Sequence, residues 1–116
     1  MTQYDEYVGF FFKGKAFAIN DCSSKQGIHV AHQDTTEHPT EKPVALMQHY
    51  IRNSSQPGEV VFDPFMGTGT TGVAAIRSGR KFIGIEKDPR WFQVAVERIQ
   101  REMRDMDKQT IDLFQN

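Results

Sequence analysis

The clearest hydrophobic pattern in this sequence lies near its middle, where a short apolar run leads into a glycine-rich loop. Val60 to Phe62 favour β-structure and are followed directly by Asp63. Glycines stand at positions 67 and 69, and residues 70–77 are read as a helix. The pattern therefore predicts a strand, a ligand-binding loop and the start of a helix.

A second strand and a second helix are predicted directly after the first helix. Ser78-Gly79 ends that helix, because glycine can take the left-handed cap conformation. Residues 80–86 predict a strand that ends in Glu86. Asp88-Pro89 then supplies an N-cap and a first-turn proline. The helix that follows has apolar residues at helical spacing, namely Phe92, Ala95, Val96, Ile99 and Met103.

The polar positions of this last helix predict a solvated face more than a nucleic-acid site. Arg98, Arg101 and Arg104 alternate with acidic residues, which is typical of an exposed, salt-bridged face. We expect the core to end at residue 104 and residues 105–116 to form a polar tail. The tail carries Ile111, Leu113 and Phe114 as candidate docking residues.

The first third of the chain predicts a hairpin, a loop and a helix. Two apolar stretches, Tyr7 to Phe12 and Lys15 to Ile19, flank a Lys13-Gly14 turn signal and predict a β-hairpin over residues 6–20, whose phenylalanines we expect mainly in the core. Residues 21–37 are polar without a sustained period and predict a loop. Pro43 suits the first position of a helix, which the polar stretch 53–58 ends. Its apolar stripe consists of Leu46, Met47, Tyr50 and Ile51.

Composition adds limits to this picture. A chain of 116 residues makes one domain, and its 25% charged residues and net charge of −1 are not those of a protein that binds nucleic acid by charge alone. A single cysteine, Cys22, excludes an internal disulfide and fits a cytoplasmic location. We see no signal peptide and no membrane-spanning run. His29 and His32 have metal-ligand spacing, but solvated loop histidines explain them better, so we expect no metal.

Two ligand classes compete for the glycine loop. Gly67, Gly69 and Gly72 spell the G-x-G-x-x-G pattern of dinucleotide sites, although this spelling alone is a weak signal. Asp63 separates the two classes, because a carboxylate at the end of a parallel strand would repel a pyrophosphate and attract an ammonium or a sulfonium. S-adenosylmethionine (SAM) carries both of these cations. Glu86 lies where an acid typically meets ribose hydroxyls, and it argues for adenosine in either class.

Three segments in this order resemble motifs X, I and II of the β-class SAM-dependent DNA amino-methyltransferases, which make N6-methyladenine or N4-methylcytosine. The segments are His38 to Pro43, Asp63 to Thr71 and Phe82 to Glu86. Tyr7 to Lys15 also resembles the strand and turn that follow the catalytic half of these enzymes. The resemblance implies an α/β fold, namely a partial Rossmann-like SAM-dependent methyltransferase fold with an N-terminal β-hairpin and a SAM-binding core over residues 38–104.

The resemblance also implies roles for individual residues. Asp63 and the loop that follows it would hold the methionine end of SAM, and Glu86 would hold the ribose hydroxyls. The segment with His38, Thr40 and Lys42 would close over the methionine moiety. The loop positions carried over are Phe65, Met66, Gly67, Gly69 and Thr70.

The sequence lacks the catalytic motif IV of that family, written Asp/Asn/Ser-Pro-Pro-aromatic. Asp63-Pro64-Phe65 does not replace it, because it has one proline and belongs to the loop. Residues 21–37 are also too few for a target-recognition region. We therefore assign no catalytic residue and expect the SAM-binding part of a methyltransferase. The alternative is an inactive methyltransferase-derived protein that serves as a protein-binding or inhibitory module.

Such a partial fold predicts a partner. A mostly parallel sheet that is cut short leaves a bare strand edge and apolar surface. We expect a homodimer or a second chain that completes the sheet, with an interface that uses the hairpin. DNA would then be contacted only through the partner, and no membrane is involved.

Overall fold

The computed structural model describes residues 14–15 and 42–115. Of the predicted hairpin, only Gly14 and Lys15 are among these residues. The predicted loop 21–37, with Cys22, His29 and His32, lies outside the described residues, as do the two predicted site residues His38 and Thr40.

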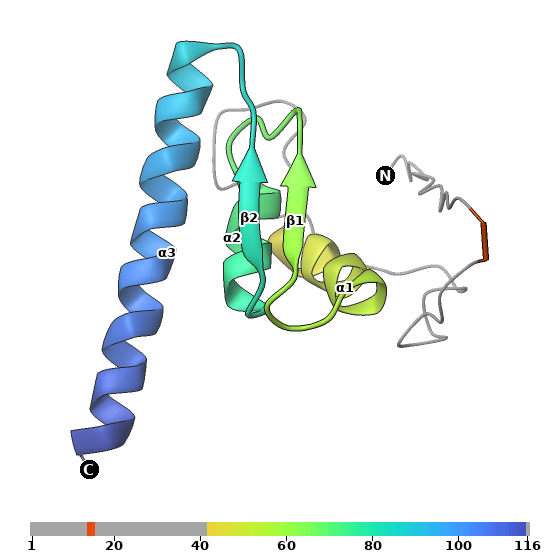
Figure 1. Ribbon diagram of the computed structural model, residues 1–116. Helices are drawn as coiled ribbons and strands as arrows, with labels where there is room; N and C mark the ends of the chain where they lie inside the picture. The colour runs from red at the N-terminus through yellow and green to blue at the C-terminus, as the bar shows by residue number, and fades with distance from the viewer. Residues whose placement is uncertain (1–13, 16–41, 116) are drawn as a thin grey trace, which may run out of the picture.

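The described chain alternates helices and strands around a small parallel sheet. The order is α1 (Val44–Ser54), β1 (Val60–Asp63), α2 (Thr70–Arg77), β2 (Lys81–Gly84) and α3 (Pro89–Gln115). β1 and β2 pair in parallel, with Val60 opposite Lys81 and Asp63 opposite Gly84. Since the chain returns to the start of the sheet through α2, both strands end at the same edge (Figure 1). This is the βαβ arrangement that the sequence predicted.

Helix α2 lies at the centre of the packing. It covers one face of the strands, and both α1 and α3 pack against it (Figure 1). Ala74 and Ala75 of α2 are fully buried and form a core with Ile51 of α1. Met47, Val61 and Phe82, among other partly buried residues, pack against this core. Small side chains on α2 let three elements approach it at once.

Gly72 shows how close this approach is. A Cβ atom at this position would collide with Ile99 of α3 and with the ring of Phe82 of β2. The missing side chain at Gly72 therefore lets α2 lie close to β2 and to α3 at the same time.

The other face of the sheet is open among the described residues. Side chains alternate along each strand, so every second residue points away from α2. Val60, Phe62, Ile83 and Ile85 are 54%, 58%, 56% and 53% exposed. Figure 1 shows both strands in front of α2, with no labelled helix on the near side. We call these four residues the open sheet face.

Helix α3 differs from the sequence-based expectation in its length. Residues 105–115 were predicted as a polar tail, but they continue the helix without a break. The segment contains neither glycine nor proline, so nothing in it stops a helix that is already formed. Every side chain from Asp107 to Gln115 is exposed, and Figure 1 shows this end of α3 extending past the other elements. Leu113 and Phe114 are 80% and 87% exposed, so they have not docked on the domain.

The end of the sheet where the strands begin is tied together by Arg80. Its guanidinium donates hydrogen bonds to the carbonyl and hydroxyl oxygens of Ser55, after α1, and to the carbonyl of Ser78, after α2. The Arg80 side chain is buried, so these hydrogen bonds replace the water that the charge loses.

Helix α1 begins one residue later than predicted. Pro43 was expected at the first helical position, but its backbone is extended and it forms the N-cap before Val44. No helix in the described part of the chain has the length and apolarity to cross a membrane.

Candidate functional site at the glycine loop

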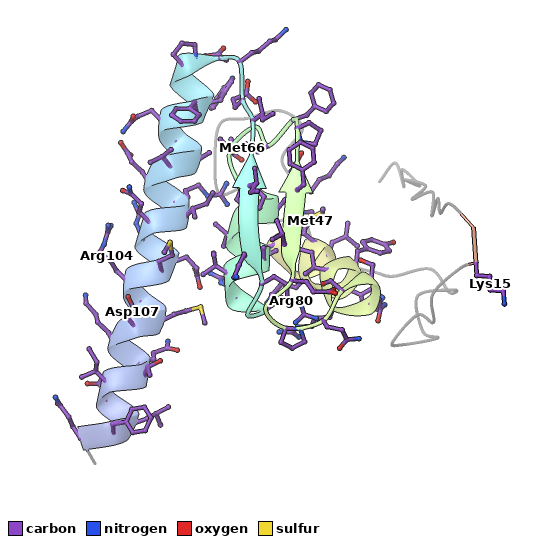
Figure 2. The ribbon with its side chains drawn as sticks, in the orientation of Figure 1. Lys15, Met47, Met66, Arg80, Arg104 and Asp107 are labelled. Carbon is purple, nitrogen blue, oxygen red and sulfur yellow. The ribbon has the colours of Figure 1, made fainter. Side chains whose placement is uncertain are left out.

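The glycine loop lies at the edge of the sheet where both parallel strands end. The N–H of Met66 donates a hydrogen bond to the carbonyl of Ile85 at 3.0 Å, and the N–H of Ile85 donates to the carbonyl of Asp63 at 3.0 Å. These bonds extend the strand pairing into the loop. Figure 2 places Met66 at this end of the sheet and Arg80 at the opposite end. The carboxyl end of parallel strands is where open α/β sheets bind ligands.

Two glycines give the loop its shape. Gly67 and Gly69 have φ angles of 52° and 81°, in the left-handed region that favours glycine. The N–H of Gly69 donates to the carbonyl of Met66 at 2.8 Å, which closes a tight turn. Gly69 is also the N-cap of α2. The first N–H groups of α2 therefore follow the loop directly, and they have no carbonyl partner within the helix.

Two carboxylates meet this loop from the strand ends. Asp63 Oδ1 accepts a hydrogen bond from the N–H of Phe65 at 2.9 Å. Glu86 Oε2 accepts from the N–H of Gly67 at 3.0 Å, and its Oε1 accepts from the N–H of Asp88 at 2.9 Å. Both acids are half-buried. The structure thus brings three of the predicted site residues, Asp63, Gly67 and Glu86, together at this edge of the sheet, and their roles toward a ligand stay a prediction.

Three other predicted loop residues differ in what they can offer. Phe65 is 87% exposed, so its ring is accessible to a ligand. Met66 is only 7% exposed, and its sulfur lies against Gly84, so its side chain belongs to the packing of the loop on β2. Thr70 is buried at the first position of α2. Met66 and Thr70 can therefore serve a ligand mainly through their backbone.

The predicted methionine-end segment is described at one position only. Lys42 is exposed and lies two residues before α1. Its predicted role in closing over a ligand stays a prediction. Among the residues that the structure describes, no group of three histidine, cysteine or acidic side chains could hold a metal ion.

Arg98 is the residue that sequence reasoning assigned wrongly. It was predicted on a solvated, salt-bridged face, but it is half-buried and turns to the glycine loop. Its Nη1 atom donates to the carbonyl and to the hydroxyl of Thr68, both at 2.9 Å. Arg101 and Arg104 are exposed, and Figure 2 shows Arg104 on the side of α3 away from the strands. The sequence carried one signal that Arg98 could face inward, because it lies directly before Ile99, one of the apolar residues at helical spacing.

The arrangement can hold a ligand of mixed character. Carboxylates at the ends of both strands suit a cationic group or hydroxyl donors, while the N–H groups of α2 suit acceptors. The glycines leave room for the ligand to approach the backbone closely.

Comparison with known proteins places this site in a known sequence family. The model of a family described as DNA methylase matches residues 4–97. The chain is 52% identical over 62 residues to the DNA adenine methyltransferase YhdJ of Escherichia coli K12, covering 53% of this chain and 21% of that protein. It is 40% identical over 88 residues to the type II methyltransferase M.HinfI of Haemophilus influenzae, covering 76% of this chain and 24% of that protein.

A solved structure agrees with the sequence matches. The crystal structure of an M1.HpyAVI–SAM complex superposes with a TM-score of 0.59 at 40% identity, covering 70% of this chain and 42% of that one. The predicted α/β fold, part of a Rossmann-like methyltransferase fold, is thereby confirmed for the described elements. The chain spans 21% and 24% of the length of the two curated relatives.

Proposed function

This chain belongs to the DNA methylase family, and we propose that it is the SAM-binding part of a DNA amino-methyltransferase that modifies adenine N6 or cytosine N4. The observation that carries the proposal is the glycine loop at the strand ends, with Asp63 and Glu86 hydrogen-bonded to its backbone. The M1.HpyAVI structure, which is similar over 70% of this chain, is a SAM complex and supports the choice of ligand.

Each end of SAM has a partner in this arrangement. In the proposal, Asp63 attracts the cationic methionine end, which carries an ammonium and a sulfonium. Glu86 accepts hydrogen bonds from the ribose hydroxyls, as acids at this place in dinucleotide folds do. A pyrophosphate would instead meet Asp63 as a like charge, so the proposal favours SAM over a nicotinamide dinucleotide.

The methyl-transfer step needs groups that we do not find in this sequence. An amino group of a flipped base must be held by polar acceptors and a stacking ring, which the family supplies through motif IV. The five prolines of this chain are at positions 39, 43, 57, 64 and 89, so no Pro-Pro pair exists. In the proposal, further polypeptide therefore supplies motif IV and the contacts to DNA.

The open sheet face supports the same conclusion. Four large apolar side chains, each more than half exposed, lie together on one side of a two-stranded sheet. A two-stranded sheet is marginal by itself, and an exposed apolar face of this kind marks an interaction surface. We propose that this face is covered by a second copy of this chain, or by a second chain that also adds strands at the edge of the sheet.

Calorimetric titration of the chain with SAM and with NAD tests the ligand. We expect SAM to bind and NAD to bind more weakly. Asp63→Asn is the sharpest variant, because the amide oxygen can still accept the hydrogen bond from Phe65 while the charge is lost. Losing a charge-assisted hydrogen bond costs about 1.5–3 kcal/mol, or roughly a 10- to 150-fold rise in Kd. Tighter binding of NAD, or an unchanged SAM affinity in Asp63→Asn, would refute the ligand assignment.

Transfer of a labelled methyl group from SAM to mixed-sequence DNA tests the second half of the proposal. The purified chain alone should transfer none, because it lacks the base-holding motif. Gly67→Trp fills the loop and serves as the control for contaminating activity. Incorporation that this variant abolishes would show that the chain is a complete catalyst and would overturn the assignment.

A further inference from the structure

A continuous series of hydrogen bonds runs through the glycine loop from Arg98 to Glu86. Arg98 Nη1 donates to the carbonyl of Thr68 at 2.9 Å. The N–H of Gly69 donates to the carbonyl of Met66 at 2.8 Å. The N–H of Gly67 donates to Glu86 Oε2 at 3.0 Å.

Two peptide groups of the backbone link these three hydrogen bonds into one continuous series. The carbonyl of Thr68 and the N–H of Gly69 belong to the same peptide group, and so do the carbonyl of Met66 and the N–H of Gly67. Two peptide groups thus stand in line between a guanidinium and a carboxylate. Every donor in the line points in the same direction, from the cation on α3 to the anion after β2.

Such a line is stronger than its separate bonds. A cation on a carbonyl oxygen polarises the peptide group and makes its N–H a better donor, and each bond strengthens the next. Both end bonds involve a charged group, which makes them the stronger kind. We call this series the peptide relay.

We propose that Arg98 is a positioning residue that fixes the glycine loop through the peptide relay, and that it acts on Gly67 and Glu86 through the two intervening peptide groups. The proposal rests on the proposed SAM site, because Glu86 is the acid that would receive the ribose. It goes beyond that site by assigning a function to a residue on α3 outside all three motif segments. The loop is then held in its binding shape before the ligand arrives, which lowers the ordering cost of binding.

A merely structural role makes a different prediction. If Arg98 only helps α3 to pack on α2, its loss would weaken the whole domain and open all slowly exchanging amides together. The relay instead predicts a local change at the N–H of Gly67, two peptide groups away from Arg98. The reverse also holds, because loss of the Glu86 charge should loosen Gly69, which Glu86 does not contact.

Amide hydrogen exchange of the unliganded chain, measured by NMR, distinguishes the peptide relay from a packing role of Arg98. The variants are Arg98→Met, Arg98→Lys, Glu86→Gln and the double variant Arg98→Met/Glu86→Gln. Arg101→Met is the matched control, since it removes an exposed arginine from the same helix. Urea unfolding of each variant reports global stability independently.

We expect Arg98→Met to speed exchange at Gly67 and Gly69 by about three- to ten-fold, the size of one hydrogen bond's net contribution. Arg98→Lys should recover part of this protection, and Arg101→Met should leave it unchanged. The double variant should exchange more slowly than the product of the two single effects predicts, because both break the same line. Unchanged exchange at Gly67 in a folded Arg98→Met, or strictly multiplicative effects, would overturn the relay.

Two further arms keep the test decisive. If Arg98→Met does not fold, faster exchange at Gly69 in Glu86→Gln supports the relay and unchanged exchange there overturns it. SAM titration of the same variants should show a Kd raised by about three- to ten-fold in Arg98→Met. If the wild-type chain binds no SAM, the proposed function fails while the exchange data still decide the relay.

Discussion

Position 69 needs two properties that only glycine combines. Its φ of 81° is in the left-handed region, which costs other residues about 1–2 kcal/mol. A Cβ atom there would also lie 2.9 Å from the Cβ and 3.0 Å from the Cα of Ala95 on α3. The loop is therefore shaped both by its own backbone and by the helix that packs behind it.

Gly69→Ala should accordingly lower stability more than the same change at a glycine that has a positive φ but no close neighbour. Gly79 has a φ of 73°, but a Cβ atom there would meet nothing within 4 Å. We expect Gly79→Ala to lower the free energy of unfolding by about 1–2 kcal/mol, from backbone strain. Gly69→Ala adds an overpacking cost of about 1–3 kcal/mol. Urea unfolding of both variants measures this, and equal losses would show that α3 does not confine the loop.

Residue chemistry explains which residues of the candidate site the sequence could indicate. Asp63, Gly67 and Glu86 were predictable, because strand ends and left-handed turns restrict the residue types that fit them. The burial of Met66 was not predictable, since it depends on Gly84 leaving space on the neighbouring strand. The contact of Arg98 with Thr68 spans 30 residues of sequence and arises only when α3 packs on α2.

At the scale of elements, local signals set most boundaries. α2 runs from Thr70 to Arg77 as predicted, because Gly69 caps its start and Gly79 turns the chain after its end. The start of α3 follows from Asp88, whose Oδ1 accepts from the N–H of Arg90 at 2.9 Å. The end of α3 could not be predicted, because polar residues permit a helix as readily as a tail. The outer third of α3 is a helix that packs on nothing described.

α3 is joined to α2 in its middle. Arg77 of α2 and Glu102 of α3 form a bidentate ion pair, with Nε–Oε1 and Nη2–Oε2 distances of 2.8 and 2.9 Å. The hydrogen bond from Arg77 to Glu102 raises the pKa of Arg77 above its usual value. Beyond Met106 no side chain of the helix is even half-buried.

Shortening α3 from its C-terminal end should therefore change the free energy of unfolding little, until the truncation removes Glu102 of the ion pair and then Ile99. A chain that ends after Met106 should keep its free energy of unfolding within about 0.5 kcal/mol, as exposed positions do. A chain that ends after Arg98 loses Ile99, whose removal from the α2 contact should cost about 2–5 kcal/mol. Urea unfolding with far-UV circular dichroism measures both. A large loss in the longer chain would mean that the outer part of α3 supports the domain.

At the scale of the whole molecule, the described elements are covered on one side only. Helices α1 and α3 both pack on α2, which lies on one face of the sheet, and the opposite face carries four apolar side chains that are each more than half exposed. The family match and the similar solved structure both agree with the fold of these described elements. The sequence predicted a partner from the cut sheet, and it placed the interface on the hairpin, of which only Gly14 and Lys15 are described. The open sheet face is a second candidate, and side-chain alternation along β1 and β2 defines it.

The open sheet face should make the isolated chain associate. Burying a side chain such as Phe62 fully contributes about 1.5–3 kcal/mol, so four half-exposed ones favour a covered state. We expect the wild-type chain to sediment as a dimer or larger species at micromolar concentration. Phe62→Lys and Ile83→Lys should give folded monomers, because both side chains are already more than half exposed. Leu113→Lys is the control, since it removes an apolar residue that is 80% exposed on α3, away from the sheet. A wild-type chain that is wholly monomeric under these conditions, or association lost equally in Leu113→Lys, would contradict the assignment of the open sheet face as the interface.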